Sequence, residues 1–395
     1  MTLPILSQDP ADPDFVQNPY PFYDRARKTG SFFLWKEYNL VCSGNWAAVN
    51  AIFRDRRFGR EAPPDFAPAI PPHLAPFYAV EAHSMLELEP PRHTRLRSLV
   101  LRAFTSRRIA GLAPEIAALS HELIDAFPSG PFDLLAAFGQ PLPVRIIARL
   151  LGVPEERAPD LLAWSNAMVT MYRAGRSAAD EVTAVAATEA FVAFLRDYVE
   201  ARRARPADDL ITHLIAAEAE GDKLSTDELI STCILLLNAG HEATVHTIGN
   251  GMKTLLSRPD AAALLMPEKV EATVEEILRH DPPLHMFTRW AYDDIDAMGH
   301  RFKRGDQVGL LLGAANRDPG QWEKPGEFQP DRPVKPSSSF GAGLHFCVGA
   351  PLARLELQIA LPILLQRCPD LRMTEPPRYA DVYHFHGLKR LMVAR

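Results

Sequence analysis

The feature of this sequence that constrains its fold most is a long stretch of helical pattern that begins at Ser225 and stops near Ser257. Ser225 is a good N-cap, and Glu228 stands three residues later, as in a capping box. Pro259 marks the end, because the residue before a proline disfavours helical backbone. About 30 residues at 1.5 Å each make a rod of roughly 45 Å. The sequence therefore predicts one helix as long as a whole domain.

Helical spacing also dominates three other parts of the chain, and short strands are expected in fewer places. The helical parts are 91–205, 268–281 and 351–368. Strand-like pieces with turns are expected within 32–44, 288–319 and 382–395. Six prolines between Glu61 and Pro76 are expected to exclude regular structure there. The sequence predicts a mainly α fold with a minor β part.

Charge and cysteine content exclude several classes of protein. A net charge of −6 and a sequence pI near 6.1 give no electrostatic support for nucleic-acid binding. The four cysteines form no C-x-x-C pair, and so few in 395 residues are not a disulfide framework, which favours a reducing compartment. No apolar run approaches the ~20 residues that span a bilayer, and the N-terminus lacks a signal-peptide pattern. We therefore expect a soluble, cytoplasmic protein without a membrane partner.

Cys347 lies in a glycine-containing loop, FGAGLHFCVG, just before a helical pattern. The positive end of a helix and its free N–H groups stabilise a thiolate. Three interpretations are open at this point. The cysteine could be a buried structural residue, a nucleophile that needs a positioned base, or a thiolate ligand of haem iron.

The spacing Phe-x-x-Gly-x-x-x-Cys-x-Gly, filled by Phe340, Gly343, Cys347 and Gly349, resembles the haem-binding loop of the cytochrome P450 family. His345 stands two residues before the cysteine, as in most bacterial members. The resemblance implies haem b as the cofactor, with the axial thiolate from Cys347. It also implies the cytochrome P450 fold, in which haem lies between a long central helix and the cysteine loop.

A second pair of segments is similar to the structural network of that family. Glu276 and Arg279 form its Glu-x-x-Arg on a helix, where positions i and i+3 share a face. Arg332, in FQPDR, matches the arginine that completes a buried Glu-Arg-Arg network. The resemblance implies that this network holds the proximal side of the haem pocket. Since the resemblance runs from about Pro19 to the C-terminus, residues 1–395 are expected to form one catalytic domain.

Four donor groups match family positions beside the haem propionates. His93 and Arg97 are four residues apart on one face of an expected helix, and both can donate to an anion. Arg289 matches the family's arginine at the start of a strand beside the other propionate, and His345 joins them. Each alone is equally well explained as a surface group, but together they predict a propionate site.

The stretch AGHEAT on the long helix matches the family's oxygen-binding groove. The small residues Ala239, Gly240 and Ala243 are expected to clear one helix face for the cofactor and O2. Glu242 is the expected acid. Ala243 stands where the family usually has a threonine, and Thr244 lies ~100° further around the helix, so its hydroxyl cannot simply substitute. We therefore predict that water or the substrate delivers protons, with Glu242 feeding the chain.

The substrate pocket is expected to be largely apolar, which suits a hydrophobic or amphipathic small molecule. Its walls are expected to come from the loop 61–84, the long helix, the segment 284–287 and the tail turn 383–385. The side chains expected to line it are those of Leu236, Ala239, Leu284, Phe287 and Phe385.

The resemblance implies a monooxygenase that inserts one oxygen of O2 into such a molecule, with electrons from an external ferredoxin and its reductase. Five arginines are expected to form either a basic patch for an acidic ferredoxin or a solvated helix face. They are Arg92, Arg95, Arg102, Arg107 and Arg108. Ala243 keeps open a peroxide-driven or oxidative-coupling enzyme. A non-catalytic haem sensor and a cysteine hydrolase are the alternatives from other classes.

Overall fold

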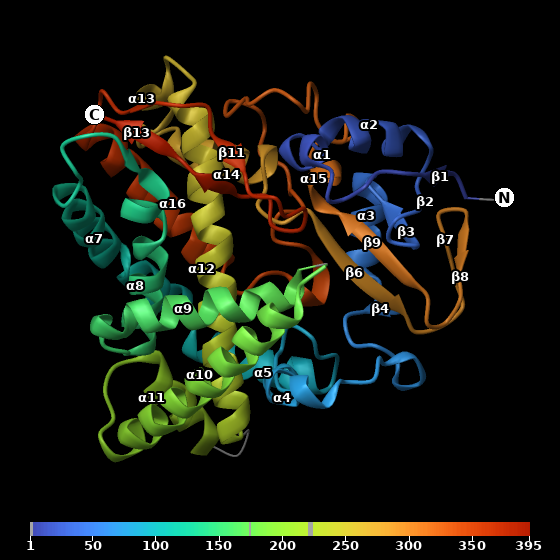
Figure 1. The fold of residues 1–395 in the computed structure, drawn as a ribbon, viewed down its shortest axis with the longest axis horizontal. Helices are drawn as coiled ribbons and strands as arrows, with labels where there is room; N and C mark the ends of the chain where they lie inside the picture. The colour runs from blue at the N-terminus through green and yellow to red at the C-terminus, as the bar shows by residue number, and fades with distance from the viewer. Residues whose placement is uncertain (1–2, 174, 220–223) are drawn as a thin grey trace.

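The computed structural model describes residues 3–173, 175–219 and 224–395. Helices make up the left side of Figure 1, and a sheet of short strands lies to the right. The predicted mainly α fold with a minor β part is confirmed. The helices are α1 (Pro13–Gln17), α2 (Tyr20–Lys28), α3 (Trp46–Arg54), α4 (Ala75–Glu81), α5 (Arg92–Ala103), α6 (Ser106–Gly111), α7 (Ala113–Asp125), α8 (Pro141–Leu151), α9 (Ala158–Val169), α10 (Ala178–Ala204), α11 (Leu210–Ala219), α12 (Thr226–Leu256), α13 (Ala261–Leu264), α14 (Val270–His280), α15 (Leu312–Ala315) and α16 (Ala350–Arg367).

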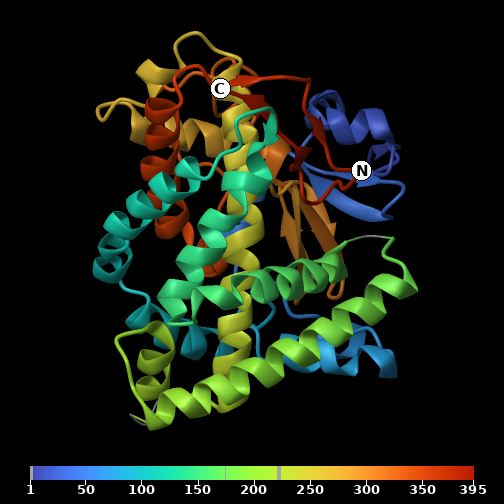
Figure 2. The same cartoon turned by 60° about the vertical axis from the view of Figure 1, so that its left-hand side comes forward.

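The predicted long helix is α12, which has 31 residues and crosses the centre of the molecule. Both hydrogen bonds of the capping box are present: Glu228 N–H donates to the Ser225 hydroxyl, and Ser225 N–H donates to the Glu228 carboxylate. Figure 2 shows α12 running from top to bottom, with α10 crossing its lower end. Helices α8, α14 and α16 pack along it, so α12 forms the centre of the helical part of the molecule.

The main sheet has the strand order β1-β2-β3-β9-β6-β4. Its centre pairs β6 with β9 in antiparallel register, Thr288 opposite Gly309, so that β6 carries Arg289 at the edge of the helical part. The β1–β2 and β3–β9 pairs are parallel. The strands are β1 (Ile5–Leu6), β2 (Phe33–Trp35), β3 (Leu40–Ser43), β4 (Phe58–Gly59), β6 (Met286–Ala291) and β9 (Gln307–Leu311).

Smaller sheets complete the β part. The hairpin β7–β8 projects from the main sheet, and the C-terminal tail pairs with β5, β10 and β11. Their strands are β5 (Phe132–Asp133), β7 (Ile295–Ala297), β8 (His300–Phe302), β10 (Arg372–Met373), β11 (Arg378–Tyr379), β12 (Leu388–Arg390) and β13 (Met392–Ala394).

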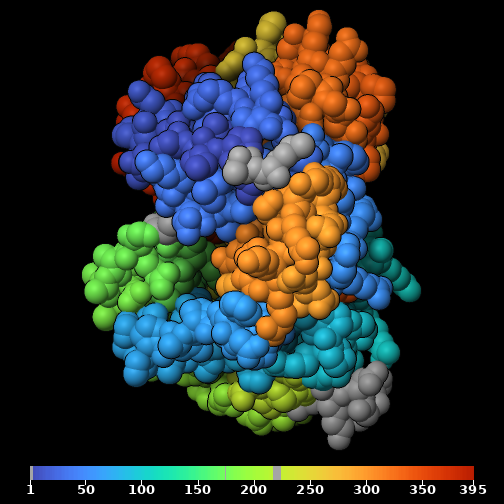
Figure 3. Space-filling view, turned by 90° about the vertical axis from the view of Figure 1, so that its right-hand side faces the viewer, coloured from blue at the N-terminus to red at the C-terminus, as the bar shows by residue number. Residues whose placement is uncertain are grey.

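The proline-rich segment is more regular than predicted. It contains two short 3-10 turns, Pro64–Phe66 and Pro72–Leu74, and α4 already begins at Ala75. Pro76 does not prevent this helix, because proline is well tolerated in the first helical turn, where its missing N–H has no intrahelical partner. In Figure 3 this segment is light blue and lies below the orange strands of the sheet region.

No helix among the described residues combines the length and apolar character needed to cross a bilayer.

Candidate active site

The cysteine loop is fixed mainly by its own backbone. The N–H of Cys347 donates to the carbonyl of Phe340 at 3.0 Å, which closes the loop. Gly341 and Gly343 have φ values of 67° and 69°, in the left-handed region that favours glycine. A Cβ at Gly343 would also lie 2.2 Å from the carbonyl oxygen of Phe53. Position 343 therefore needs a glycine both for its dihedral angle and for close approach to α3.

Cys347 lies directly before α16, and backbone hydrogen bonds from Gly349 and Ala350 reach its sulfur. Burial raises the pKa of the Cys347 thiol, and these N–H groups together with Arg97 oppose that rise without cancelling it. Burial is therefore the larger effect in the protein alone. A bound metal cation reverses this balance, since a coordinating thiol is deprotonated outright.

The four predicted propionate contacts come together beside this loop. The rings of His93 and His345 lie 4.3 Å apart between centroids, and the Arg97 guanidinium donates to the carbonyl of Phe346 at 2.6 Å. His93 is 1% exposed, and neither ring nitrogen has a hydrogen-bond partner. Burial first, and then the neighbouring His345 and Arg97, lower the pKa of His93 to about 4. A buried imidazole without partners is a group that a ligand would satisfy.

Arg289 is also buried and poorly neutralised. Its guanidinium donates to its neighbour's carbonyl, on Thr288, and lies over the ring of Phe53 at 4.9 Å. Burial and then the nearby Arg60 lower the pKa of Arg289 to about 9, against the opposing effect of Glu89. A buried cation in this position favours an anionic ligand.

Glu89 is a residue of this group that the sequence analysis missed. Its carboxylate accepts from His345 Nε2 at 2.8 Å and from the backbone N–H of Arg60 at 2.7 Å. Burial tends to raise the pKa of Glu89, but these hydrogen bonds and the charge of Arg289 lower it overall. Glu89 stands four residues before His93, so its proximity to that residue was visible, whereas its contact with His345 is not local in sequence.

The middle of α12 carries an open stripe of accessible residues, in contrast to the buried groups beside the cysteine loop. We define this stripe by its incompletely buried residues, which recur at helical spacing along a central helix. Ala239 is exposed, although buried positions flank the stripe on the same turns, among them Leu237, Asn238 and His241. The incompletely buried residues of this segment are Leu235, Leu236, Ala239, Gly240, Glu242, Ala243 and His246, and the stripe comprises all of them except Gly240, which lies against a side chain of α8. The middle of this central helix is therefore accessible at Ala239, and the role predicted for Ala239 and Ala243 stays a prediction.

Gly240 differs from the prediction that it clears the cofactor face. A Cβ at this position would lie 2.5 Å from Cδ1 of Ile147, so the glycine admits a side chain of α8. The physical reason is that Gly240 lies about 100° around the helix from Ala239 and faces a neighbouring helix. Thr244 is 4% exposed and therefore lies off the open stripe, in agreement with the prediction that it cannot substitute for the hydroxyl missing at Ala243.

Glu242 lies on the stripe with two histidines against its carboxylate. His246 Nε2 is 3.2 Å from Oε1, and His241 Nδ1 is 3.9 Å from Oε2. Burial alone would raise the pKa of Glu242, but the hydrogen bond from His246 and the charges of His246, His241 and Arg173 lower it overall. His246 was not among the predicted residues, although its i+4 spacing from Glu242 is a signal present in the sequence.

The predicted Glu-Arg-Arg network is assembled as a buried cluster. Glu276 binds the Arg279 guanidinium through both oxygens at 2.7 Å, and Arg332 Nε reaches Glu276 Oε1 at 3.1 Å. Arg279 also donates to the carbonyls of Asn316 and Pro325. With a further bond to the carbonyl of Glu327, all five N–H donors of Arg279 are used, which is the condition under which a buried ion pair is tolerated.

The predicted pocket residues on the strand and the tail lie side by side. Leu284 and Phe385 form an isolated antiparallel bridge, and both side chains are half-buried, as is that of Phe287. Backbone hydrogen bonds from His285 to His384 and from His386 to Pro283 hold the two segments together. The structure thus brings Leu284 and Phe385 together, while Leu236 and Ala239 belong to the open stripe.

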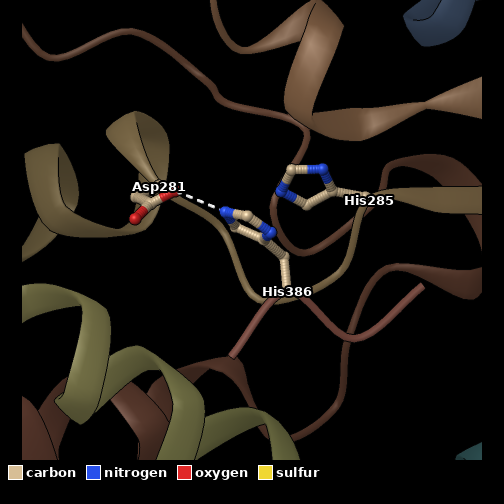
Figure 4. A group of neighbouring side chains, drawn as sticks. All are labelled: Asp281, His285 and His386. Atoms are coloured by element: carbon tan, nitrogen blue, oxygen red, sulfur yellow. Dashed lines mark ion pairs between the residues drawn. The ribbon is translucent and has the colours of Figure 1, made fainter. Parts of the chain in front are cut away.

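Behind this wall lies a buried cluster of Asp281, His285 and His386, drawn in Figure 4. Their ligand atoms lie within 4.8 Å of one another, a spacing that could suit a metal ion. However, Asp281 already accepts from Tyr20 at 2.8 Å, from Tyr379, and from the Lys253 ammonium at 3.0 Å. A cation on Asp281 disfavours a second one. We interpret the cluster as a polar network that anchors the tail turn.

Three of the five arginines expected to form a basic patch have partners within the protein. Arg92 donates to the carbonyl of Ala82, Arg95 pairs with Glu228, and Arg108 pairs with Asp208. Two of these charges are therefore balanced by carboxylates, and a ferredoxin patch and a solvated helix face both stay predictions.

These residues fit a flat, acidic, metal-containing cofactor. The thiol of Cys347 supplies one soft ligand, and the accessible alanines of the stripe leave one face of α12 open. The unpartnered nitrogens of His93 and the buried cation of Arg289 suit acidic substituents. The donor set thus matches haem better than a bare metal ion, for which one cysteine would be a poor site.

Comparison with known proteins places this chain in a family. The family model for cytochrome P450 matches residues 159–377, so the chain belongs to the cytochrome P450 family. Members bind haem b with a cysteine thiolate as the axial ligand, and the chain is an enzyme of the cytochrome P450 monooxygenase class.

Two relatives and one solved structure match nearly the whole chain. Cytochrome P450 monooxygenase PikC of Streptomyces venezuelae is 36% identical over 405 residues, covering 99% of this chain and 94% of PikC. The biotin biosynthesis cytochrome P450 of Bacillus subtilis is 35% identical over 399 residues, with 98% and 99% coverage. The crystal structure of P450BioI in complex with hexadec-9Z-enoic acid ligated acyl carrier protein superposes with a TM-score of 0.91 at 34% identity. That match covers 97% of this chain and all of P450BioI. The predicted family and fold are confirmed.

Proposed function

We propose that this enzyme inserts one oxygen atom of O2 into a hydrophobic small molecule, with electrons from a ferredoxin-type donor. The observation that carries the proposal is the open stripe of α12, where an acid, Glu242, lies beside accessible apolar residues at the centre of the molecule. We also propose that residues 1–395 act as one catalytic domain, because α12, α14 and α16 pack together across the whole structure.

The cofactor side of the proposal assigns a role to each donor. Cys347 is the axial ligand, and Phe340 and Gly349 shape its loop. His93, Arg97, Arg289 and His345 hold the propionates, for which the unpartnered His93 and the buried Arg289 are the main support. The network of Glu276, Arg279 and Arg332 supports the proximal side.

Haem b with a thiolate ligand supplies the electron-rich iron that favours cleavage of the O–O bond. The chain's own residues must then bring protons and exclude other reactions. Glu242 is the acid that passes protons inward, and water or a substrate hydroxyl completes the path, since Ala243 offers none. Gly240 and Thr244 contribute by packing rather than by chemistry. Gly240 lies against a side chain of α8, and Thr244 is buried off the open stripe.

The substrate side is supported by the apolar character of the wall. Leu236, Ala239, Leu284, Phe287 and Phe385 are all incompletely buried and apolar, as a hydrophobic ligand requires. The ligand of the P450BioI structure, a fatty acyl chain on a carrier protein, suggests long-chain acids as first probes.

The test is a pair of spectra on the purified holoenzyme. The reduced, CO-bound wild type should show the Soret band of a thiolate-ligated haem, and Cys347→Ser should lose that band. Cys368→Ser, a change at a buried cysteine outside the loop, should keep it. Hexadec-9-enoic acid and a panel of apolar compounds are then added to the ferric enzyme, and displacement of the resting spectrum identifies binders. An unchanged CO band in Cys347→Ser would overturn the ligand assignment.

A peroxide-driven or oxidative-coupling enzyme is the second candidate, favoured by the missing hydroxyl at Ala243. Comparing turnover with hydrogen peroxide against turnover with ferredoxin, its reductase and NADPH separates the two. Product formed only with peroxide would replace the ferredoxin-dependent proposal.

A further inference from the structure

His246 is the titratable residue of the open stripe that the proposed function does not use. It lies one helical turn after Glu242, and each of the two side chains is 14% exposed. Residues at i and i+4 lie on the same helix face, so the 3.2 Å contact between Nε2 and Oε1 is set by the helix itself. The pair therefore lies on the same partly accessible face of α12 as Ala239 and Ala243.

The other edge of the imidazole is held by the C-terminal tail. A Cβ at Gly387 would lie 1.9 Å from His246 Nδ1, so the ring rests directly on the backbone of that residue. Gly387 itself is fixed, because its N–H donates to Phe385 and its carbonyl accepts from Ala380. The ring is thus confined between a carboxylate and a hydrogen-bonded turn, and it cannot swing away from Glu242.

The charge of Glu242 makes this contact chemically important. Its pKa is lowered overall although burial opposes this, so near neutral pH it is a carboxylate and carries no proton to give. A group that passes protons inward must first receive one. Histidine is the side chain that exchanges protons between pH 5 and 8. The other titratable or charged groups that act on the carboxylate are His241 on α12 and Arg173 after α9.

His241 is a poorer candidate for the same task. It is 2% exposed, neither ring nitrogen has a hydrogen-bond partner, and its nearest approach to Glu242 is 3.9 Å. It lies off the open stripe, among buried residues. Arg173 holds its proton at any ordinary pH and cannot supply one.

We propose that His246 is a positioning and proton-loading residue for Glu242. In its imidazolium form His246 transfers the Nε2 proton to Glu242 Oε1 and keeps the proton on Nδ1. Glu242 then releases that proton toward the oxygen side, and Nε2, the ring nitrogen on the open stripe, regains one from solvent, because Nδ1 is buried against Gly387 without a hydrogen-bond partner. This inference rests on the proposed function of Glu242. It also explains how a chain with Ala243 delivers protons, because the missing hydroxyl is compensated by a loaded acid.

The first test does not depend on turnover. Nuclear magnetic resonance of the reduced, CO-bound holoenzyme, which is diamagnetic, follows histidines labelled at the ring, and His246 is assigned by the signal lost in His246→Gln. Replacing the partner, in Glu242→Gln, should change the ring-nitrogen signal of His246, because Nε2 loses the carboxylate in contact with it. An unchanged signal would overturn the proposal.

The second test measures oxygen consumption with a ferredoxin, its reductase and NADPH, from pH 5.5 to 8.5, without added organic substrate. His246→Gln keeps a donor at the Nε2 end but does not titrate. Wild-type rates should fall as pH rises across this range, and His246→Gln should be about tenfold slower at low pH with no such fall. His213→Gln is the control, since His213, on α11, contacts an exposed acid, Asp208, that precedes this helix.

The outcomes separate the inference from the function on which it rests. If His246→Gln keeps the wild-type rate and pH profile while Glu242→Gln is slow, His246 is only a structural neighbour. If Glu242→Gln also keeps the wild-type rate, the proposed role of Glu242 itself fails. If both variants lose the CO-bound Soret band, the changes act on haem binding and the proton-loading proposal is wrong.

Discussion

The cysteine loop and the open stripe of α12 are built in different ways. The loop is set by backbone: a hydrogen bond from Cys347 to Phe340, two glycines at positive φ, and the close approach of Gly343 to Phe53. The stripe is set by side chains of one helix, in which Glu242 and His246 meet only because they are one turn apart.

This difference shows where the enzyme can vary. Any side chain change in the loop disturbs a backbone geometry that has no alternative, so the loop matches its family at every fixed position. A change on the stripe alters chemistry but leaves α12 helical, and the departure at Ala243 is found there. The predictions below test this contrast, beginning with the largest expected effect.

The buried network behind the loop should be the least tolerant site. Glu276→Gln leaves the buried guanidinium of Arg279 without its carboxylate and should destabilise the protein by about 3–5 kcal/mol. Glu275→Gln is the matched control, because Glu275 pairs with Arg354 at a more exposed position and should cost at most about 1 kcal/mol. Urea unfolding of the holoenzyme, followed by haem absorbance, measures both. Equal losses would mean that burial of the network does not matter.

Substitutions at two glycines of the loop separate the cost of a positive φ from the cost of a steric clash. Gly341→Ala meets nothing closer than 4.0 Å and should cost about 1–2 kcal/mol for its positive φ alone. Gly343→Ala has a similar φ and also places Cβ 2.2 Å from the Phe53 carbonyl, so it should cost clearly more and reduce haem retention. The measurement is the urea midpoint together with the haem-to-protein absorbance ratio. If the two variants behave alike, the close approach to α3 is not a constraint.

The steric crowding that an alanine at position 387 causes should depend on His246 alone. Gly387→Ala drives a methyl group into the His246 ring and should cost about 1–3 kcal/mol through overpacking. The same change in a His246→Ala background should be nearly neutral, because the space is then free. Thermal unfolding of the two single variants and the double variant forms the cycle. A full cost in the double variant would show that the tail backbone, not the imidazole, rejects the methyl group.

Low pH should destabilise the protein through His241, a buried residue of α12. Burial lowers the pKa of His241 to about 4, below the value of about 6.5 for an unfolded histidine. Its contribution to stability is therefore complete above pH 6.5 and is lost as pH falls toward 4, because the unfolded chain binds the proton first. The slope is at most about 1.4 kcal/mol per pH unit. His241→Asn should flatten the pH dependence of the urea midpoint over this range, whereas Glu275→Gln should not.

The smallest effect is expected at the position where the chain departs from its family. Ala243→Thr should cost only about 0.6 kcal/mol in helix propensity and should not raise product formation or oxygen consumption. The reason is that proton delivery already runs through Glu242 and water or substrate. A large gain in coupled product from the added hydroxyl would contradict this expectation, with the CO-bound spectrum as a check that haem content is unchanged.

Much of this site could be predicted from sequence because its signals are local or strictly spaced. Ser225 with Glu228 fixed the start of α12, and the cysteine spacing led to Cys347. The contact between Glu276 and Arg279 followed from their i, i+3 positions. The space near Ala239 followed from helical periodicity.

The contacts that could not be predicted join segments that are far apart in the sequence and meet only in the fold. Nothing near Gly240 shows that Ile147 occupies the space beside it, and Glu89 gives no sign that it binds His345. The start of α4 at Ala75 was not predicted, because prolines were expected to exclude regular structure, whereas proline is tolerated in the first turn of a helix. His246 is different, since its spacing from Glu242 was present and only its importance was unclear.

The tail turn has one consequence for engineering. It contributes Phe385 to the proposed pocket wall and, two residues later, the backbone on which His246 rests. On these proposals, residues 385–387 affect both substrate preference and the supply of protons, and a library that diversifies them to accept larger molecules will also change how the enzyme uses oxygen. Replacing this segment with that of a relative should succeed only when position 246 of α12 is replaced by the relative's residue as well.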